Sequence, residues 1–286
     1  MISLSRPIKC LFLKKKRQMD LKILEGKRGI ISGALDESSI AWKVAQKAAA
    51  AGAKFTLTNA PIAMRMGEIN KLAETTGAEI IPADATSIED IENLFIKSEE
   101  ILGGKIDFIL HSIGMSPNVR KKKAYTDLNY DWFDKTLDVS AISLHKMVQT
   151  GLKTDTIAEG ASVACLSYIA AQRTFSEYGD MAEAKSLLES LTRSLGYHAG
   201  KAKGIRVNSI SQSPTWTTAG SGVPGFDKFF NYADMMSPLG NASAEDCANY
   251  VVMMFSDYAK AVTMQNLYHD GGFSSTGVVP EIMDKV

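Results

Sequence analysis

The segment RGIISGALDESSIA, residues 28–41, decides the fold. Its first five residues form a short run that contains two isoleucines, and Gly33 follows them directly. An amphipathic stretch at residues 39–51 begins within the same segment. A strand that passes through a glycine turn into a helix opens a βαβ unit, in which the helix carries the chain back to a parallel strand. The segment therefore predicts an α/β fold built on a parallel sheet.

The same alternation continues along the chain. We expect strands at residues 28–32, 54–58, 79–82, 107–111, 162–167, 206–211 and 266–270. The stretches between them predict helices at 39–51, 64–76, 87–102, 130–150, 181–200 and 244–255. Short, continuous apolar strands are typical of a sheet that helices cover on both faces. The sequence predicts a single doubly wound Rossmann-type domain at residues 21–286, with about seven parallel strands.

Residues 1–20 differ from the rest, because they carry six cationic side chains and no acid before Asp20. We interpret them as a basic tail that is disordered or not native, with Met19 as the alternative translation start. A targeting segment is the competing interpretation. No stretch has the length of a membrane span, so we expect a cytoplasmic protein without a membrane partner.

Charge and cysteine content exclude several classes of function. Of the 286 residues, 32 are Lys or Arg and 32 are Asp or Glu, a balance that gives no reason to expect a nucleic-acid partner. The three cysteines are far apart, so they predict neither a disulfide framework nor a paired metal site. Cys165 falls in an apolar run and is expected to be a buried, inert thiol. We expect no metal.

The turn after the first strand has features of a phosphate site. Gly33 lets the backbone approach a pyrophosphate, and the helix that follows offers free N–H groups. Ser38 or Ser39 is expected to cap that helix, and Asp36 and Glu37 are expected to point outward. The common G-x-G-x-x-G spacing is absent. A plain strand-turn-helix connection is therefore the alternative interpretation.

Three later strand ends complete the candidate cofactor site. Residues 58–61 contain no acid for the adenine ribose and no cation before Arg65, which favours NADH, with NADPH as the alternative. Asp84 suits either the adenine amino group or the start of a helix. In the segment His111-Ser-Ile-Gly114, the glycine allows close passage of a ribose or nicotinamide, and His111 is expected to be a packed strand-end residue.

Tyr178 and Lys185 form the candidate catalytic pair. They are seven residues apart, close to two helical turns, so both can face one side of a helix. A nearby ammonium lowers the pKa of a phenol, and a phenol can donate to a carbonyl oxygen as negative charge develops there. The lysine can also hold ribose hydroxyls. A tyrosine and a lysine that merely share a helix face are the alternative.

These motifs resemble the bacterial enoyl-acyl-carrier-protein reductases, a divergent branch of the short-chain dehydrogenase/reductases. The resemblance extends over about residues 21–275. It is carried by residues 33–41, 111–114 and 166–168, by Tyr178-x6-Lys185, and by 206–211, Pro214 and 270–273. Ordinary short-chain dehydrogenases have Tyr-x3-Lys, but Ala182 stands at that position here. A second Tyr-x3-Lys, at Tyr197 and Lys201, closes a helix before the next strand and cannot occupy the usual site.

The resemblance implies reduction of a trans-2-enoyl thioester on acyl carrier protein by NADH, in a homotetramer. Tyr178 would bind the thioester carbonyl, Lys185 the nicotinamide ribose, and Tyr168 would assist as a second phenol. The implied cofactor contacts are Gly33, Ser39, Ile40, Asp84, Ala85, Ile113, Lys185, Thr215, Trp216, Thr217, Thr218 and Ala219. Ser116 and Met181 would contact the substrate.

Some features leave alternatives open. Residues 220–236 are either a mobile flap over the acyl chain or an ordinary packed helix pair. The basic run at residues 120–123 is either a docking site for an acidic carrier protein or a solvated loop tip. Two other functions remain as competitors: a reductase of 3-oxoacyl or small carbonyl substrates, and a cofactor-binding scaffold without turnover.

Overall fold

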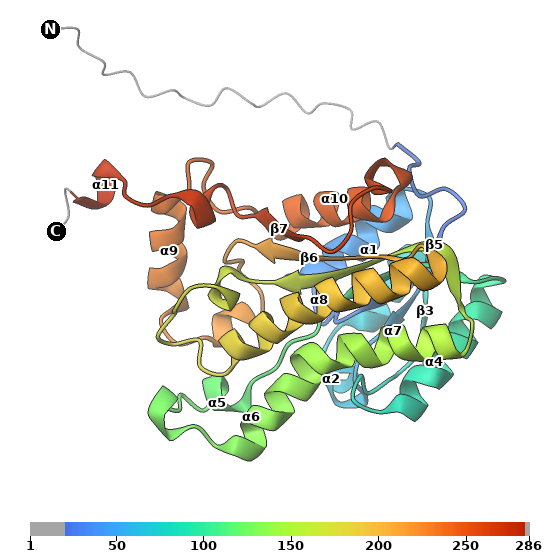
Figure 1. Cartoon of the computed structure of the whole chain (residues 1–286), viewed down its shortest axis with the longest axis horizontal. Coiled ribbons are helices and arrows are strands. Elements are labelled where there is room, and N and C mark those ends of the chain that lie inside the picture. Colours follow the sequence, from blue (N-terminus) through green and yellow to red (C-terminus); the bar gives the residue numbers. More distant parts are fainter. Residues whose placement is uncertain (1–20, 284–286) are drawn as a thin grey trace, which may run out of the picture.

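The apolar runs of the sequence form one parallel sheet in the computed structural model, which describes residues 21–283 (Figure 1). The strands are β1 Arg28–Ser32, β2 Lys54–Thr58, β3 Glu79–Ile80, β4 Ile106–His111, β5 Ile157–Ser167, β6 Arg206–Gln212 and β7 Asn266–His269. Their spatial order is β3-β2-β1-β4-β5-β6-β7, and each pair of neighbours is parallel. This confirms the predicted fold class. The predicted basic tail at residues 1–20 lies outside the described residues.

Helices cover both faces of the sheet, as Figure 1 shows. On one face lie α1 Ile40–Ala50, α3 Ile69–Thr76 and α10 Ala244–Phe255, which share an apolar cluster around the buried Trp42. The other face carries α4 Ile88–Leu102, α7 Ser143–Lys153 and α8 Met181–Lys203, around Phe95. The remaining α-helices that the structure describes are α2 Pro61–Met66, α5 Pro117–Arg120, α6 Tyr130–Leu137, α9 Phe226–Met236 and α11 Pro280–Met283. Burial on both faces explains why the strands are continuous apolar runs.

The strand order reverses between β1 and β4. In this register Ser32 lies beside His111, so the turns after these two strands are neighbours. Gly33 has φ +90°, and a Cβ there would stand 1.9 Å from the carbonyl oxygen of Ser112. Only glycine tolerates both conditions. The edge where ligands bind in doubly wound sheets is therefore formed by two closely packed turns.

The expected helix at 64–76 is wrong, because the structure has two helices there. The break falls at Gly67, where a Cβ would stand 2.4 Å from the carbonyl oxygen of Leu35. That carbonyl accepts a hydrogen bond from the N–H of Glu68 at 2.8 Å. The helix is thus interrupted where the chain passes close to the turn after β1. This is a tertiary contact that no local sequence pattern reveals.

The expected helix at 130–150 contains a π-helical segment, Asp138–Ile142, between α6 and α7. Within it, Ser140 Oγ accepts from the N–H of Met115 at 3.0 Å. Such bulges often occur at functional sites, and this one holds the loop after β4. The fifth strand is also longer than expected, because it begins at Ile157 and contains Gly160 at φ +71°.

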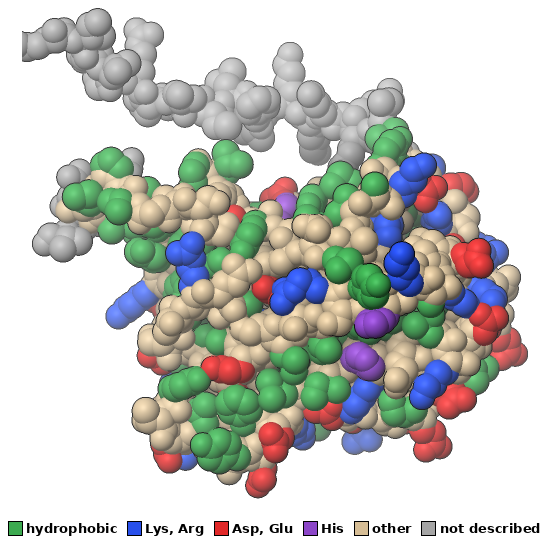
Figure 2. Space-filling view, in the orientation of Figure 1, with side chains coloured by type: hydrophobic (Ala, Val, Ile, Leu, Met, Phe, Trp, Pro, Cys, Tyr) green, Lys and Arg blue, Asp and Glu red, His purple; other side chains and the backbone are tan. Residues whose placement is uncertain are grey.

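No helix among residues 21–283 is both long and apolar enough to cross a membrane. The same residues contain no cluster of His, Cys, Asp and Glu that could hold a metal ion. Figure 2 shows acidic and basic side chains intermixed on the face that it displays, in keeping with the balanced charge of the chain.

Candidate active site

Two tyrosines meet beyond the carboxyl end of β5. Tyr168 directly follows that strand, and the centroids of its ring and that of Tyr178 are 5.2 Å apart, with the planes inclined by 54°. The Tyr168 hydroxyl is buried and has no hydrogen-bond partner among the described residues. A buried, unpartnered donor next to a second phenol fits a site that receives a polar group of a ligand.

Tyr178 does not lie on the helix that carries Lys185, so the expected shared helix face is wrong. The helix α8 begins at Met181, whose N–H donates to the Tyr178 carbonyl at 3.2 Å. Gly179, at φ +50°, separates the Tyr178 turn from the helix. The expected lowering of the Tyr178 pKa is also wrong for the free protein, because burial raises that pKa above its ordinary value.

Lys185 lies on the second turn of α8 and is buried. Its Nζ donates to the Leu166 carbonyl at 2.7 Å, and it stands 3.9 Å from where a Cβ on Gly114 would be. The ammonium thus reaches the edge of the sheet between β4 and β5. Burial lowers the pKa of Lys185 to about 8, while Cys165 and Glu189 act in the opposite direction.

His111 is the packed strand-end residue that the sequence predicts. It is buried, and its Nε2 lies 2.8 Å from Ser143 Oγ. Burial, with a smaller contribution from Lys185, lowers the pKa of His111 to about 3. A neutral imidazole bonded to α7 fixes the end of β4 and is not a candidate base at neutral pH.

The turn after β1 presents free backbone donors. Ser39 occupies the N-cap position of α1, but its Oγ accepts from Leu35 N at 3.2 Å and Asp36 N at 3.1 Å, so it does not cap the helix. The N–H groups of Ile40 and Ala41 therefore have no acceptor in the described part of the chain. An anion beside Gly33 would meet these donors and the positive end of the helix.

Asp36 is not simply directed outward, as the sequence had suggested. Its carboxylate accepts from Ser38 N at 2.9 Å and Ser38 Oγ at 2.6 Å, and from Thr218 Oγ1. These hydrogen bonds lower the Asp36 pKa against the opposing effect of burial. Thr218 N also donates to Ser38 Oγ at 3.2 Å. The segment 215–219 is thereby tied across the phosphate turn. Glu37, by contrast, is exposed and pairs with Lys71.

Asp84 is exposed after β3, where its Oδ1 accepts from Thr86 N at 2.9 Å. Ser87 caps α4 by accepting from Asp90 N at 3.2 Å. The arrangement accounts for Asp84 at a helix start, and a contact with adenine stays a prediction. Ala85 follows at the same edge of the sheet.

The loop after β4 carries Ile113, Gly114 and Ser116. Ser116 is buried, caps α5 by accepting from Val119 N at 3.0 Å, and donates to Asp180 at 2.5 Å. Its hydroxyl is thus engaged within the protein, and a direct substrate contact through that hydroxyl stays a prediction. Met181 Cε lies 3.9 Å from where a Cβ on Gly114 would be, on the same side as Lys185.

Sequence reasoning missed an aromatic cluster around the tyrosines. The Phe175 ring lies 5.4 Å from that of Tyr168 and 4.8 Å from that of Phe229, in α9. Phe229 in turn approaches Tyr168 edge-on at 6.0 Å. The frequency of Phe and Met in residues 226–236 was the available signal, but it did not reveal the partners. Because α9 forms here, residues 220–236 contain a packed helix.

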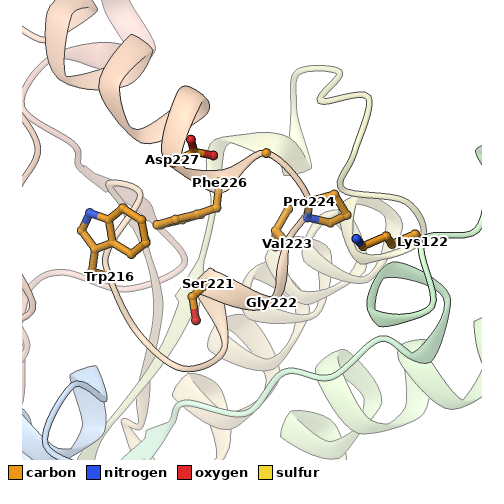
Figure 3. A pocket seen from close by; sticks show the side chains of 9 residues that line it. Lys122, Trp216, Ser221, Gly222, Val223, Pro224, Phe226 and Asp227 are labelled. Atoms are coloured by element: carbon orange, nitrogen blue, oxygen red, sulfur yellow. The ribbon is translucent and has the colours of Figure 1, made fainter.

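A pocket of about 300 Å³ adjoins the start of α9 (Figure 3). Trp216 and Phe226 stand side by side at one end, with ring centroids 4.8 Å apart, and Lys122 and Pro224 line the other. A second pocket, of about 360 Å³, shares Lys122 and Pro224 and reaches Gly179 beside the Tyr178 turn. Lys122 and Lys123 of the basic run thus line a hollow together with Glu177 and Gly179, the two residues that flank Tyr178 in the sequence.

The chain is similar to known proteins over most of its length. Residues 33–274 match the family model described as Enoyl-(Acyl carrier protein) reductase. The NADH enoyl-acyl-carrier-protein reductase 1 of Rhizobium meliloti is 32% identical over 259 residues, which cover 90% of this chain and 93% of that protein. The crystal structure of the FabI–NADH complex from Alistipes finegoldii is 59% identical, with a TM-score of 0.89, over 90% of this chain and 91% of that one. A Bacillus cereus enoyl-acyl carrier protein reductase solved with NADP+ is 29% identical, with a TM-score of 0.83, over 90% and 99%.

Proposed function

The chain belongs to the enoyl-(acyl carrier protein) reductase family, and we propose that it reduces trans-2-enoyl thioesters on acyl carrier protein with NADH. The observation that carries this function is the pair of phenols, Tyr168 and Tyr178, whose rings lie 5.2 Å apart. Lys185 lies at the same edge of the sheet, beside Gly114. These groups suit the binding of a carbonyl oxygen next to a ribose.

The cofactor fits the turns at the switch point of the sheet. Gly33 brings the backbone close, and the free N–H groups of Ile40 and Ala41 face the region where the pyrophosphate would lie. Lys185 would donate to the nicotinamide ribose, and Ile113 would line the same edge. Segment 215–219 would cover the pyrophosphate. The relatives named for NADH favour NADH, while the NADP+-bound relative keeps NADPH as the alternative.

The protein contributes polarisation of the thioester carbonyl. When bound, the reduced nicotinamide supplies the hydride that adds to the β-carbon of the enoyl thioester. The Tyr178 hydroxyl donates to the thioester oxygen, which gains charge as the double-bond electrons shift toward the carbonyl. Because burial raises the pKa of Tyr178, the phenol keeps its proton and remains a donor at neutral pH. A proton taken up from solvent then reaches the α-carbon and completes the saturated thioester.

The acyl chain would lie against the aromatic cluster. Tyr168, Phe175 and Phe229 form an apolar wall beside the phenol pair, and Met181 borders it near Gly114. Apolar walls with a few placed polar groups are typical of small-molecule sites. The wall explains how a hydrocarbon chain and a polar thioester are accepted at one site.

Carrier protein would dock near the basic run. All four side chains at residues 120–123 are exposed, and Lys122 lines both pockets. An acidic carrier would be attracted to this surface and would deliver its thioester toward Gly179. The homotetramer and the cytoplasmic location expected from the sequence stay predictions.

The experiment that tests this function compares substrates. Purified protein is mixed with NADH, or separately with NADPH, and with crotonyl thioester, and loss of cofactor absorbance is followed. We expect rapid oxidation of NADH with the enoyl thioester and little with a 3-oxoacyl thioester of the same length. Faster turnover of the 3-oxoacyl substrate would favour the competing carbonyl reductase. Binding of NADH without oxidation by either substrate would favour a scaffold.

A further inference from the structure

Asp180 lies two residues after Tyr178 and is completely buried. Its carboxylate accepts three hydrogen bonds, from Ser116 Oγ at 2.5 Å, Asn118 Nδ2 at 2.8 Å and Thr136 Oγ1 at 2.9 Å. Burial of a carboxylate is costly unless hydrogen bonds replace those lost with water. Three donors converging on this group mark it as the centre of a built polar network.

The three donors come from two separate segments of the chain. Ser116 caps α5 at the end of the loop after β4, and Asn118 lies within α5, where it is itself held by Asn129 with hydrogen bonds of 3.1 and 3.0 Å. Thr136 belongs to α6, where its hydroxyl is also within reach of the Trp132 carbonyl. Asp180 therefore joins the start of α8 to the loop that carries Gly114 and to α6.

Apart from the contact between its ring and that of Tyr168, the Tyr178 turn has few other anchors among the described residues. Its backbone bonds are local, from Tyr178 N to the Phe175 carbonyl at 3.1 Å and from Met181 N to the Tyr178 carbonyl at 3.2 Å. The phenol makes no hydrogen bond within residues 21–283. Gly179 has no side chain to pack. Asp180 follows Gly179, and its side chain is fixed in the interior of the protein. It is thus the anchor next to Tyr178 in this turn.

We propose that Asp180 is a positioning residue for Tyr178. By binding Ser116, Asn118 and Thr136, it fixes the turn so that the phenol meets the thioester oxygen as charge develops there. The inference rests on the proposed reductase function and adds a residue that the catalytic pair does not include. Misplacement of a reacting group by about 1 Å can cost about 10²-fold in rate. Loss of the network should therefore appear in kcat, not in binding.

The test uses Asp180→Asn, which keeps the size of the side chain but presents an amide donor to a site of donors. We expect kcat with crotonyl thioester to fall about 10- to 100-fold, with KM and the Kd for NADH changed less than about threefold. Ser98→Ala is the matched control, because it removes a buried hydrogen bond of 2.7 Å to Thr56 between α4 and β2. The control should keep kcat within about twofold.

A double-mutant cycle separates positioning from general damage. In a Tyr178→Phe background there is no phenol oxygen to misplace, so Asp180→Asn should lower kcat less than about twofold. An equal loss in both backgrounds, or an unchanged kcat in the wild-type background, would overturn the proposal. Wild-type protein that does not oxidise NADH at all would instead contradict the reductase function itself.

A spectroscopic measurement gives a readout that does not depend on turnover. Tyrosine labelled at Cζ is incorporated, and the Tyr178 resonance is identified by its loss in Tyr178→Phe. We expect this resonance to shift or broaden in Asp180→Asn and to stay in place in Ser98→Ala. If Asp180→Asn fails to fold, Thr136→Val removes one of the three bonds and is taken through the same cycle. An unchanged resonance together with unchanged kcat in that variant would also overturn the proposal.

Discussion

The ring centroids of Tyr168 and Tyr178 lie 5.2 Å apart, although Tyr168 directly follows β5 and Tyr178 lies in the turn before α8. The Tyr168 hydroxyl is buried without a partner among the described residues, and burial raises its pKa. The two phenols thus keep their protons and lie next to each other. Of the two residues, only Tyr178 lies in the turn that contains Asp180.

Tyr168→Phe should make the protein more stable and less active. The substitution removes a buried hydroxyl without a partner, whose desolvation costs about 1–3 kcal/mol. We expect Tm to rise or stay unchanged and kcat to fall about tenfold, because one polar group that faces the substrate is lost. Thermal unfolding and NADH oxidation measure the two effects. A lower Tm with full activity would mean that the hydroxyl has a structural partner and no part in the reaction.

NADH binding should weaken as pH rises through about 8, the value to which burial lowers the pKa of Lys185. A lysine donating to ribose hydroxyls binds best as the ammonium, so binding at a pH above that value should take up a proton. Calorimetry in buffers of different ionisation enthalpy measures this uptake. Lys185→Met should bind NADH more weakly and show no such uptake. Equal uptake in the variant would assign the proton to another group.

The free energy of unfolding should also depend on the titration of Lys185, but it should rise with pH where NADH binding weakens. Because the folded-state pKa of Lys185 is below its ordinary value of 10.5, the unfolded chain holds more protons between about 8 and 10.5. Stability attributable to Lys185 therefore rises with pH in that window. The difference between wild type and Lys185→Met in denaturant titrations isolates this contribution. A constant difference across the window would contradict it.

Gly33→Ala should disrupt the phosphate turn. A Cβ there meets the Ser112 carbonyl oxygen at 1.9 Å, and the φ of +90° is strained for alanine. We expect a lower Tm, since strain of this kind costs about 1–3 kcal/mol. NADH affinity should fall more than about tenfold, because a displaced turn no longer brings its backbone to the pyrophosphate. Gly222→Ala is the control, because no atom lies within 4 Å of its Cβ position. A variant that binds NADH normally would show that the turn does not approach the cofactor.

Charge reversal in the basic run should affect only substrates on carrier protein. Arg120→Glu with Lys121→Glu should raise KM for the acyl-carrier-protein substrate about tenfold at low salt and leave KM for a small crotonyl thioester unchanged. Lys97→Glu, an exposed position on α4, is the control. The effect should fade as salt is added. A KM that rises equally for both substrates would place the charges at the thioester site.

The sequence predicted the parallel sheet and the glycine turn after its first strand because those depend on local patterns. Apolar runs, Gly33 and the positions of the strands are all visible along the chain. The break at Gly67 was not predicted, since it depends on the approach of Leu35 from another turn. The expectation that Tyr178 and Lys185 share a helix face was also wrong, because spacing alone does not show that Gly179 adopts a left-handed conformation.

The same limit explains what was missed around the site. No pattern in the sequence identifies Asp180 as the centre of a polar network. Its three donors, Ser116, Asn118 and Thr136, are 44 to 64 residues away in sequence. The pKa of Tyr178 was predicted to fall on the basis of Lys185, but burial raises it, and burial follows from the packed fold. Contacts of this range require the structure.

The most direct test of the central claim is the single-turnover rate of NADH oxidation by Tyr178→Phe with crotonyl thioester. The account predicts a rate about 10²- to 10³-fold below that of wild type, as when one donor to a developing oxyanion is removed, with the Kd for NADH unchanged. A rate equal to that of wild type at saturating NADH would contradict the account, because the carbonyl oxygen would then be stabilised by a group other than Tyr178.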